Sequence, residues 1–222
     1  MATPGSSRRP DRVEETSQRL GELLVVHRVK VLAAVIALVV LGAAGWFYRR
    51  SIEVKHDRAE AAYFRAREVY AARNYPLAEA DLRTVMTRYS GTPGGVMASM
   101  ALARMLYETG KPAEGIAALR DVAGSAPREL RPEVYALLGA GHENLGQFDE
   151  AAQAYQTAAG ESRFPKDRLA HRAAAARALT GAGKKEEALA IWRELAEEPS
   201  EFLASEARVR IGELTAQPGG GG

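Results

Sequence analysis

The chain has 222 residues, of which 26% are charged and 7% are aromatic, and it has no cysteine. The missing cysteines exclude disulfides, thiolate metal sites, cysteine nucleophiles and the lipidated cysteine of a bacterial lipoprotein. The formal net charge is +2, and residues 49–222 carry 24 basic and 24 acidic side chains, so this part has no excess positive charge for nucleic-acid binding.

The first expected element is a membrane-spanning helix over residues 31–48. These 18 residues carry no charge, and as a helix they are about 27 Å long, enough to cross the hydrocarbon core of a bilayer. Trp46, Phe47 and Tyr48 stand where an interfacial aromatic belt belongs. We therefore expect a polar arm at 1–30, a span at 31–48 and a juxtamembrane helical extension at 49–58.

Two other interpretations of this segment are a buried core helix and a signal peptide cleaved after Ala44. The rest of the chain is too polar to surround a core helix. The preceding arm is long and partly acidic for a signal peptide, which favours a retained anchor. Basic residues on the two flanks balance each other, so the positive-inside rule does not decide the orientation.

Residues 59–216 contain a recurring turn followed by a small residue. The small residues stand 37, 36 and 37 positions apart, at Ala78, Gly115, Ala151 and Ala188. A helical pattern precedes and follows each turn, which predicts about four helix-turn-helix units and an all-α fold without strands. The glycine-rich segment 91–95 is expected to be a turn between two units.

A capping helix is predicted over residues 201–214, because the last unit exposes an apolar face that needs a cover. The side chains available for this contact are Phe202, Leu203, Ala207, Ile211 and Leu214. We expect the glycine-rich tail at 217–222 to be disordered.

The third unit shows the repeat pattern most fully, with Leu138 and Gly139 on its first helix and Ala151 and Tyr155 on its second. At these residues the chain resembles the tetratricopeptide repeat (TPR). We expect Gly139 and Ala151 to face each other where the two helices are closest, with the larger side chains filling the space beside them. Arg65 occupies the usual leucine position of the first unit, which predicts an irregular cap there.

The sequence offers no catalytic, cofactor or metal constellation. It has four histidines, His27, His56, His142 and His171. None belongs to an HExxH motif, no phosphate-binding loop is present, and the Glu pairs fall at helix ends on outward positions. We expect His142 to lie in the core or at a hairpin edge, and we expect neither catalysis nor a bound cofactor or metal.

The TPR resemblance implies a concave groove lined by four positions of each first helix. In the first two units these positions carry aromatic, methionine and arginine side chains, the types enriched at the centres of interfaces. The candidate partner-binding residues are Tyr63, Arg67, Tyr70, Met97, Met100, Arg104 and Tyr107. The alternative is that Met97 and Met100 pack against the neighbouring unit. The last two units carry mostly small or polar residues there, so little partner contact is expected from them.

An anchor of this length followed by about four such repeats is similar to the bacterial YfgM family, an ancillary subunit of the Sec translocon. The resemblance implies a single-pass inner-membrane protein with its repeats in the periplasm, and as partners the SecYEG translocon, periplasmic chaperones and exported clients. Two alternatives stay open. One is an envelope-assembly or cell-division scaffold of the outer-membrane-assembly or Tol-Pal accessory type, and the other is an enzyme with a cryptic site.

Overall fold

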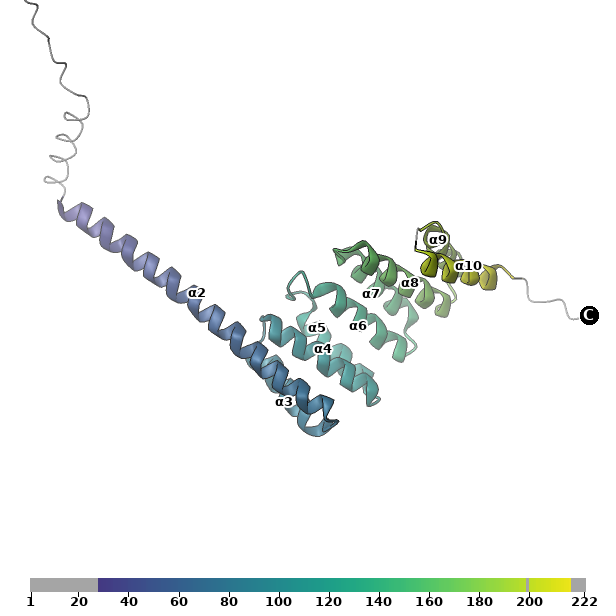
Figure 1. The fold of residues 1–222 in the computed structure, drawn as a ribbon, viewed down its shortest axis with the longest axis horizontal. Helices are drawn as coiled ribbons and strands as arrows, with labels where there is room; N and C mark the ends of the chain where they lie inside the picture. Colours follow the sequence, from purple (N-terminus) through teal and green to yellow (C-terminus); the bar gives the residue numbers. More distant parts are fainter. Residues whose placement is uncertain (1–27, 199, 217–222) are drawn as a thin grey trace, which may run out of the picture. The chain divides into compact units, whose positions relative to one another are not determined.

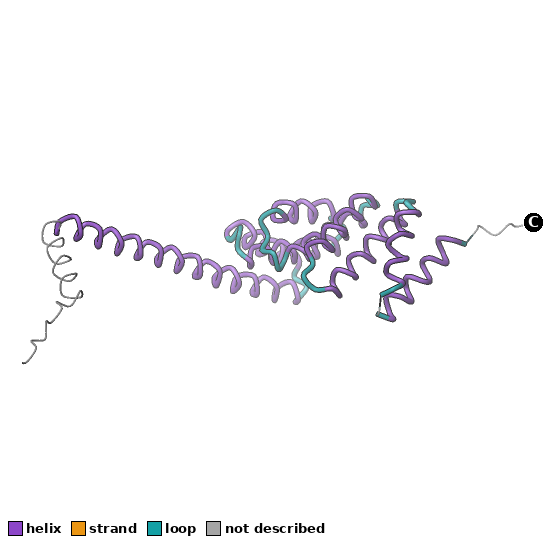
Figure 2. The backbone as a smooth tube through the Cα atoms, turned by 90° about the horizontal axis from the view of Figure 1, so that it is seen from above, coloured by secondary structure: helices purple, strands orange, loops and turns teal. Residues whose placement is uncertain are grey.

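The computed structural model describes residues 28–198 and 200–216, which form helices joined by turns with no strand among them (Figure 2). This confirms the all-α class. The helices are α2 (Arg28–Ala71), α3 (Tyr75–Arg88), α4 (Pro93–Glu108), α5 (Pro112–Ala123), α6 (Arg131–Asn144), α7 (Phe148–Glu161), α8 (Pro165–Gly181), α9 (Lys185–Ala196) and α10 (Glu201–Thr215) (Figure 1). Residues 1–27 of the expected arm and the expected tail at 217–222 lie outside the described residues.

The chain divides into two compact units, residues 1–53 and 54–222, and helix α2 contributes to both. The segment Val35–Ala71 contains a window that is long and apolar enough to cross a membrane. Its apolar side chains are exposed, with Leu38, Leu41 and Trp46 each at 69%. An exposed apolar helix near the N-terminus fits a membrane anchor or a signal sequence.

Within residues 54–222 each helix from α3 onwards packs against the next helix in the chain. The C-terminal part of α2 joins this arrangement through Tyr63 and Ala66, which share a buried apolar cluster with residues of α3 and α4. The result is a row of helix pairs closed by α10. The predicted solenoid of about four units with a C-terminal helix is confirmed.

The turn inside each helix pair explains the regular spacing of the repeats. In the third pair Gly146 has a φ of 69°, and the N–H of the next residue, Gln147, donates to the carbonyl of His142 at 2.9 Å. This is the Schellman motif that ends a helix with a left-handed residue. Gly110 and Gly183 repeat this conformation, and Arg73 adopts it in the first pair with a φ of 59°.

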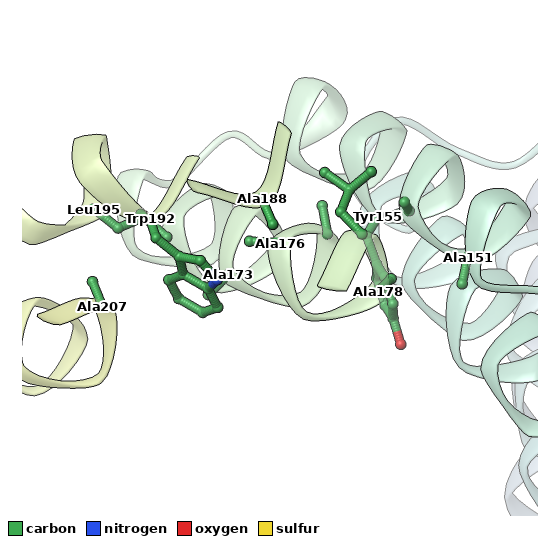
Figure 3. Close-up of a cluster of buried hydrophobic side chains, with 12 residues drawn as sticks. Ala151, Tyr155, Ala173, Ala176, Ala178, Ala188, Trp192, Leu195 and Ala207 are labelled. Carbon is green, nitrogen blue, oxygen red and sulfur yellow. The ribbon is translucent and has the colours of Figure 1, made fainter. Parts of the chain in front are cut away.

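The apolar core near the C-terminus combines many alanines with two large aromatic residues (Figure 3). Tyr155 of α7 and Trp192 of α9 are 7% and 0% exposed. Small side chains let the helix backbones approach closely, and the aromatic rings fill the remaining space. The close packing of α7, α8, α9 and α10 therefore depends on both kinds of residue.

Gly139 lies against Tyr155, one of the larger side chains expected beside the close approach of the two helices. A Cβ atom added to Gly139 would lie 2.7–2.9 Å from three ring atoms of Tyr155. The glycine is needed to make room for an aromatic ring, because any larger side chain at this position would overlap it.

The glycine-rich segment 91–95 is not simply a turn. Helix α4 begins at Pro93, and the hydroxyl of Thr92 accepts a hydrogen bond from the N–H of Gly95 at 3.1 Å. A Cβ on Gly94 would lie 2.7 Å from the backbone carbon of Ala59. Gly94 and Gly95 therefore belong to the first turn of a helix, and Gly94 allows α4 to cross α2 closely.

The C-terminal end of the row differs from the expectation in one residue. Phe202 is 80% exposed and does not seal the last pair, whereas Ala207 is buried and Leu203, Ile211 and Leu214 are half-buried against the core. At the other end of the row, Arg65 is exposed at the usual leucine position of the first unit. Its side chain instead donates to the carbonyl of Ala61 at 3.2 Å.

Candidate functional site

The seven candidate groove residues come from the C-terminal part of α2 and from α4. Tyr63 and Met100 are only 8% and 7% exposed and belong to two apolar clusters of the core. Tyr70, Met97 and Tyr107 are half-buried, and Arg67 and Arg104 are exposed. The surface that a partner could reach therefore consists mainly of Arg67, Tyr70, Met97 and Arg104.

Tyr70 of α2 packs against an apolar cluster that contains residues of α3 and α4. Partial burial, followed by the nearby carboxylate of Glu108 at the end of α4, raises the pKa of Tyr70 to about 12. The ring of Tyr70 also lies 6.0 Å from the ring of Tyr75, centroid to centroid. Tyr70 is thus only half-buried, and part of its side chain remains accessible to a partner.

Tyr107 contacts the following pair of helices more deeply. Its hydroxyl donates to the carbonyl oxygen of Leu137 on α6 at 3.0 Å, and burial raises the pKa of its phenol. A Cβ on Gly141 would lie 2.7 Å from the ring. Tyr107 therefore holds α4 and α6 together, and its truncation would affect packing as well as any partner.

The three arginines at equivalent positions of the first helices have different surroundings. Arg104 pairs with Glu133 of α6, and Arg177 pairs with Glu206 of α10, each across a separation of 29 residues. The residue 29 positions after Arg67 is the buried Val96. Within the described part of the chain, Arg67 has no ion pair. A glutamate 29 residues after the arginine is therefore a sequence signal for the ion pair. It could have separated Arg104 and Arg177 from Arg67.

The described residues contain no group of three or more His, Asp or Glu side chains placed to hold a metal ion. His142 is buried, as the sequence led us to expect, and its Nδ1 lies 2.7 Å from Oε1 of Gln147 in the turn after α6. His56 is exposed, His171 is half-buried, and His27 lies outside the described residues.

Comparison with known proteins supports the helix-pair architecture. A family described as "Tetratricopeptide repeat-like domain" matches residues 27–137 and again residues 61–170. The overlap of the two matches reflects the internal repeat. No curated protein matches the chain.

Two solved structures of a putative kinesin light chain from Podosopora anserina, with nearly identical TPR-like repeats, have a similar fold. The first, a single-substitution variant, is 20% identical, and its match covers 71% of this chain and 86% of that chain at a TM-score of 0.57. The second structure is 18% identical and covers 71% and 85%, also at a TM-score of 0.57. At this level of identity the similarity concerns the fold alone.

Proposed function

Because the chain belongs to the tetratricopeptide repeat-like domain family, we propose that it is a membrane-anchored scaffold that binds other proteins in the bacterial cell envelope. TPR-like repeats are protein-interaction scaffolds that typically have no catalytic activity. The observation that carries the proposal is the combination, in one chain, of such repeats with an exposed apolar helix long enough to cross a membrane. The anchor would confine the repeats to the membrane surface, where their partners would be concentrated.

The more specific form of the proposal is an ancillary role at the Sec translocon. In this form residues 31–48 span the inner membrane once, residues 1–30 stay in the cytoplasm, and the repeat domain at 59–216 faces the periplasm. There it contacts exported clients and periplasmic chaperones close to SecYEG. The support is the similarity of this arrangement, a small-residue-rich span followed by about four repeats, to the YfgM family.

The proposed contact surface is the groove of the first two helix pairs. Arg67 and Arg104 are exposed there, and Tyr70 and Met97 are half-buried beside them. These side chains combine apolar area with hydrogen-bond donors, as the centres of protein interfaces do. Since Arg104 is already paired with Glu133, Arg67 is the arginine of this surface that can bind an acceptor on a partner without first giving up an ion pair.

The orientation is tested by adding protease to spheroplasts. We expect residues 59–214 to be degraded, leaving a small anchored fragment. Protection of the repeats in intact spheroplasts, with cleavage only after lysis, would place them in the cytoplasm. The mass of the mature protein would also reveal cleavage after Ala44, which would remove the anchor.

The partner is tested by introducing a photoreactive residue in the groove, at Met97, and crosslinking in intact membranes. We expect crosslinks to SecYEG subunits or to envelope chaperones, and we expect Arg67→Glu to reduce them strongly. Arg120→Glu is a matched control, because Arg120 is also exposed but lies on α5. Crosslinks to outer-membrane-assembly or Tol-Pal components instead would favour the second scaffold function and contradict the Sec assignment.

A further inference from the structure

Helix α10 has the residue pattern of the first helix of a repeat. Gly212 stands 73 positions after Gly139 of α6, which is the length of two repeats, and each glycine directly follows a branched aliphatic residue. Glu206 stands at the same interval after Glu133, and each of these glutamates pairs with the arginine 29 residues before it. Helix α10 is therefore the first helix of a fifth unit. No second helix follows it within the described residues.

The face that packs against a second helix in the other units is open in α10. Gly139 is buried beneath the ring of Tyr155, and Ala176, at the same position of α8, is 0% exposed. Gly212 is exposed instead, and a Cβ atom added to it would meet nothing within 4 Å. We name this surface the α10 open face, and its residues, all exposed, are Arg208, Gly212 and Thr215.

The third and fourth units show which side chains cover this face. In the third unit the second helix, α7, carries Ala151 and, four residues later, Tyr155. In the fourth unit the second helix, α9, carries Ala188 and Trp192 at the same spacing. All four side chains are buried, and Trp192 is 0% exposed. A helix that fits the α10 open face therefore needs a small residue for close approach and an aromatic residue four positions later to fill the space beside Gly212.

The fourth unit also indicates a charge on the covering helix. Arg172 of α8 stands 36 positions before Arg208, and it pairs with Glu194 of α9, two residues after Trp192. Arg208 itself has no ion pair within the described part of the chain. A glutamate two residues after the aromatic residue of a docking helix would pair with Arg208. Because such a pair is exposed, it would fix the register of the docking helix more than it would raise the affinity.

We propose that the α10 open face binds an amphipathic helix of a partner protein, which supplies the second helix of the fifth unit. The recognised pattern is a small residue, an aromatic residue four positions later and an acidic residue two positions after that. This surface is separate from the groove, whose positions in α10, by equivalence with α6, are Glu206, Val209 and Glu213. A partner could use both surfaces together and bind more tightly than through either one alone.

A different protein suits this face better than a second copy of the chain. The sequence contains the full pattern once, at Ala188, Trp192 and Glu194 of α9. Helix α9 packs between α8 and α10 of its own chain, with Trp192 fully buried. A second copy would have to release α9 from its own core before it could offer this pattern.

The test uses the full chain in lipid nanodiscs and, as the probe, a fluorescein-labelled, hydrocarbon-stapled peptide with the α9 sequence Lys185–Ala196. Affinities are measured by fluorescence anisotropy. We expect Gly212→Leu to weaken binding by about tenfold or more, because the leucine takes the space of the aromatic ring. Gly160→Leu is the matched control, since a Cβ at Gly160 also meets nothing within 4 Å but lies on α7. Its affinity should stay within about twofold of the wild type. Circular dichroism checks that both variants remain folded.

A charge exchange tests the register of the docked helix. Arg208→Glu should weaken binding by about threefold to tenfold, and a peptide with Glu194→Arg should regain most of this loss on the Arg208→Glu variant. A change that only disturbed the fold of α10 would not be rescued in this way. A peptide with Trp192→Ala should bind at least about tenfold more weakly than the original peptide.

Several results would overturn the proposal. One is the absence of peptide binding, and another is equal binding to the wild type and to Gly212→Leu. Binding that is lost with Arg67→Glu but kept with Gly212→Leu would place the peptide in the groove instead. Self-association of the detergent-solubilised chain, measured by light scattering and abolished by Gly212→Leu, would assign the α10 open face to a second copy.

Discussion

Replacement of Gly139 by leucine tests the register of the helix pairs directly. A Cβ atom at this position would lie 2.7 Å from Cε1 of Tyr155. The ring cannot move away easily, because Tyr155 is 7% exposed and its hydroxyl donates to Oε2 of Glu143 at 2.8 Å. Overpacking of this kind costs about 1–3 kcal/mol, and disturbing the hydrogen bond adds about 1 kcal/mol.

Part of this cost is offset, because leucine is favoured over glycine in a helix by about 0.8 kcal/mol. The net loss for Gly139→Leu should be about 1–3 kcal/mol. For a domain of this size each kcal/mol changes Tm by about 2–4 °C, so we expect Tm to fall by roughly 3–10 °C. Thermal unfolding followed by circular dichroism measures this change.

Gly160→Leu is the matched control for the same chemical change. Gly160 lies in α7, and a Cβ added there meets nothing within 4 Å. Its Tm should stay the same or rise by about 2 °C through helix propensity alone. In addition, Gly139→Leu combined with Tyr155→Ala should show a coupling energy of about 0.5–3 kcal/mol. Equal Tm changes for the two leucine variants would refute the contact between Gly139 and the Tyr155 ring.

Three further predictions concern the turns, a phenol and the core. Arg73→Gly should raise the free energy of unfolding by about 1 kcal/mol, and Gly146→Ala should lower it by a similar amount, because the left-handed conformation costs a non-glycine residue about 1–2 kcal/mol; urea titration measures both. Tyr70 should ionise near pH 12 rather than 10.0, as seen in the difference in tyrosinate absorbance between the wild type and Tyr70→Phe. Its pKa is raised in the folded state, so the stability that it contributes is complete below pH 10.0 and is lost as the pH rises to about 12. Trp192→Ala should cost about 3–5 kcal/mol in the same urea titration, and Trp192→Phe should cost much less, because it removes an indole N–H that is buried without a partner among the described residues.

The repeat architecture could be predicted from the sequence because its signals are local. A left-handed residue such as Gly146 and a small residue shortly after it recur at nearly constant spacing, and each turn needs only its own neighbours to form. In contrast, the local sequence does not reveal which side chain packs against a small residue. Gly139 makes room for the ring of Tyr155, and this contact depends on how α6 and α7 cross.

The candidate groove could be predicted only by position along each helix. Position alone does not separate Tyr63, which is buried, from Arg67, which lies one helical turn further and is exposed. The difference arises from the close crossing of α2 and α4, where Gly94 approaches the backbone of Ala59. That crossing joins residues far apart in the chain, so helical periodicity within α2 does not reveal it.

A hollow at the starts of α6 and α8, lined by Glu133 and Ala170, illustrates why small residues are ambiguous in a repeat protein. The sequence led us to expect little partner contact from positions such as Ala140 and Ala170, because short side chains offer little area. Ala140 is equivalent to Arg104 and Arg177 in the other first helices, and Ala170 is equivalent to Glu133 and Glu206. At those equivalent positions Arg104 pairs with Glu133, and Arg177 pairs with Glu206. With alanine at both positions, the junction of α6 and α8 has neither this ion pair nor its side-chain volume, and Ala170 lines the hollow. A small residue therefore has two possible meanings. Where a large ring lies against it, it permits close helix packing, and where no side chain fills the gap, it leaves open space. Only the three-dimensional arrangement distinguishes these two cases.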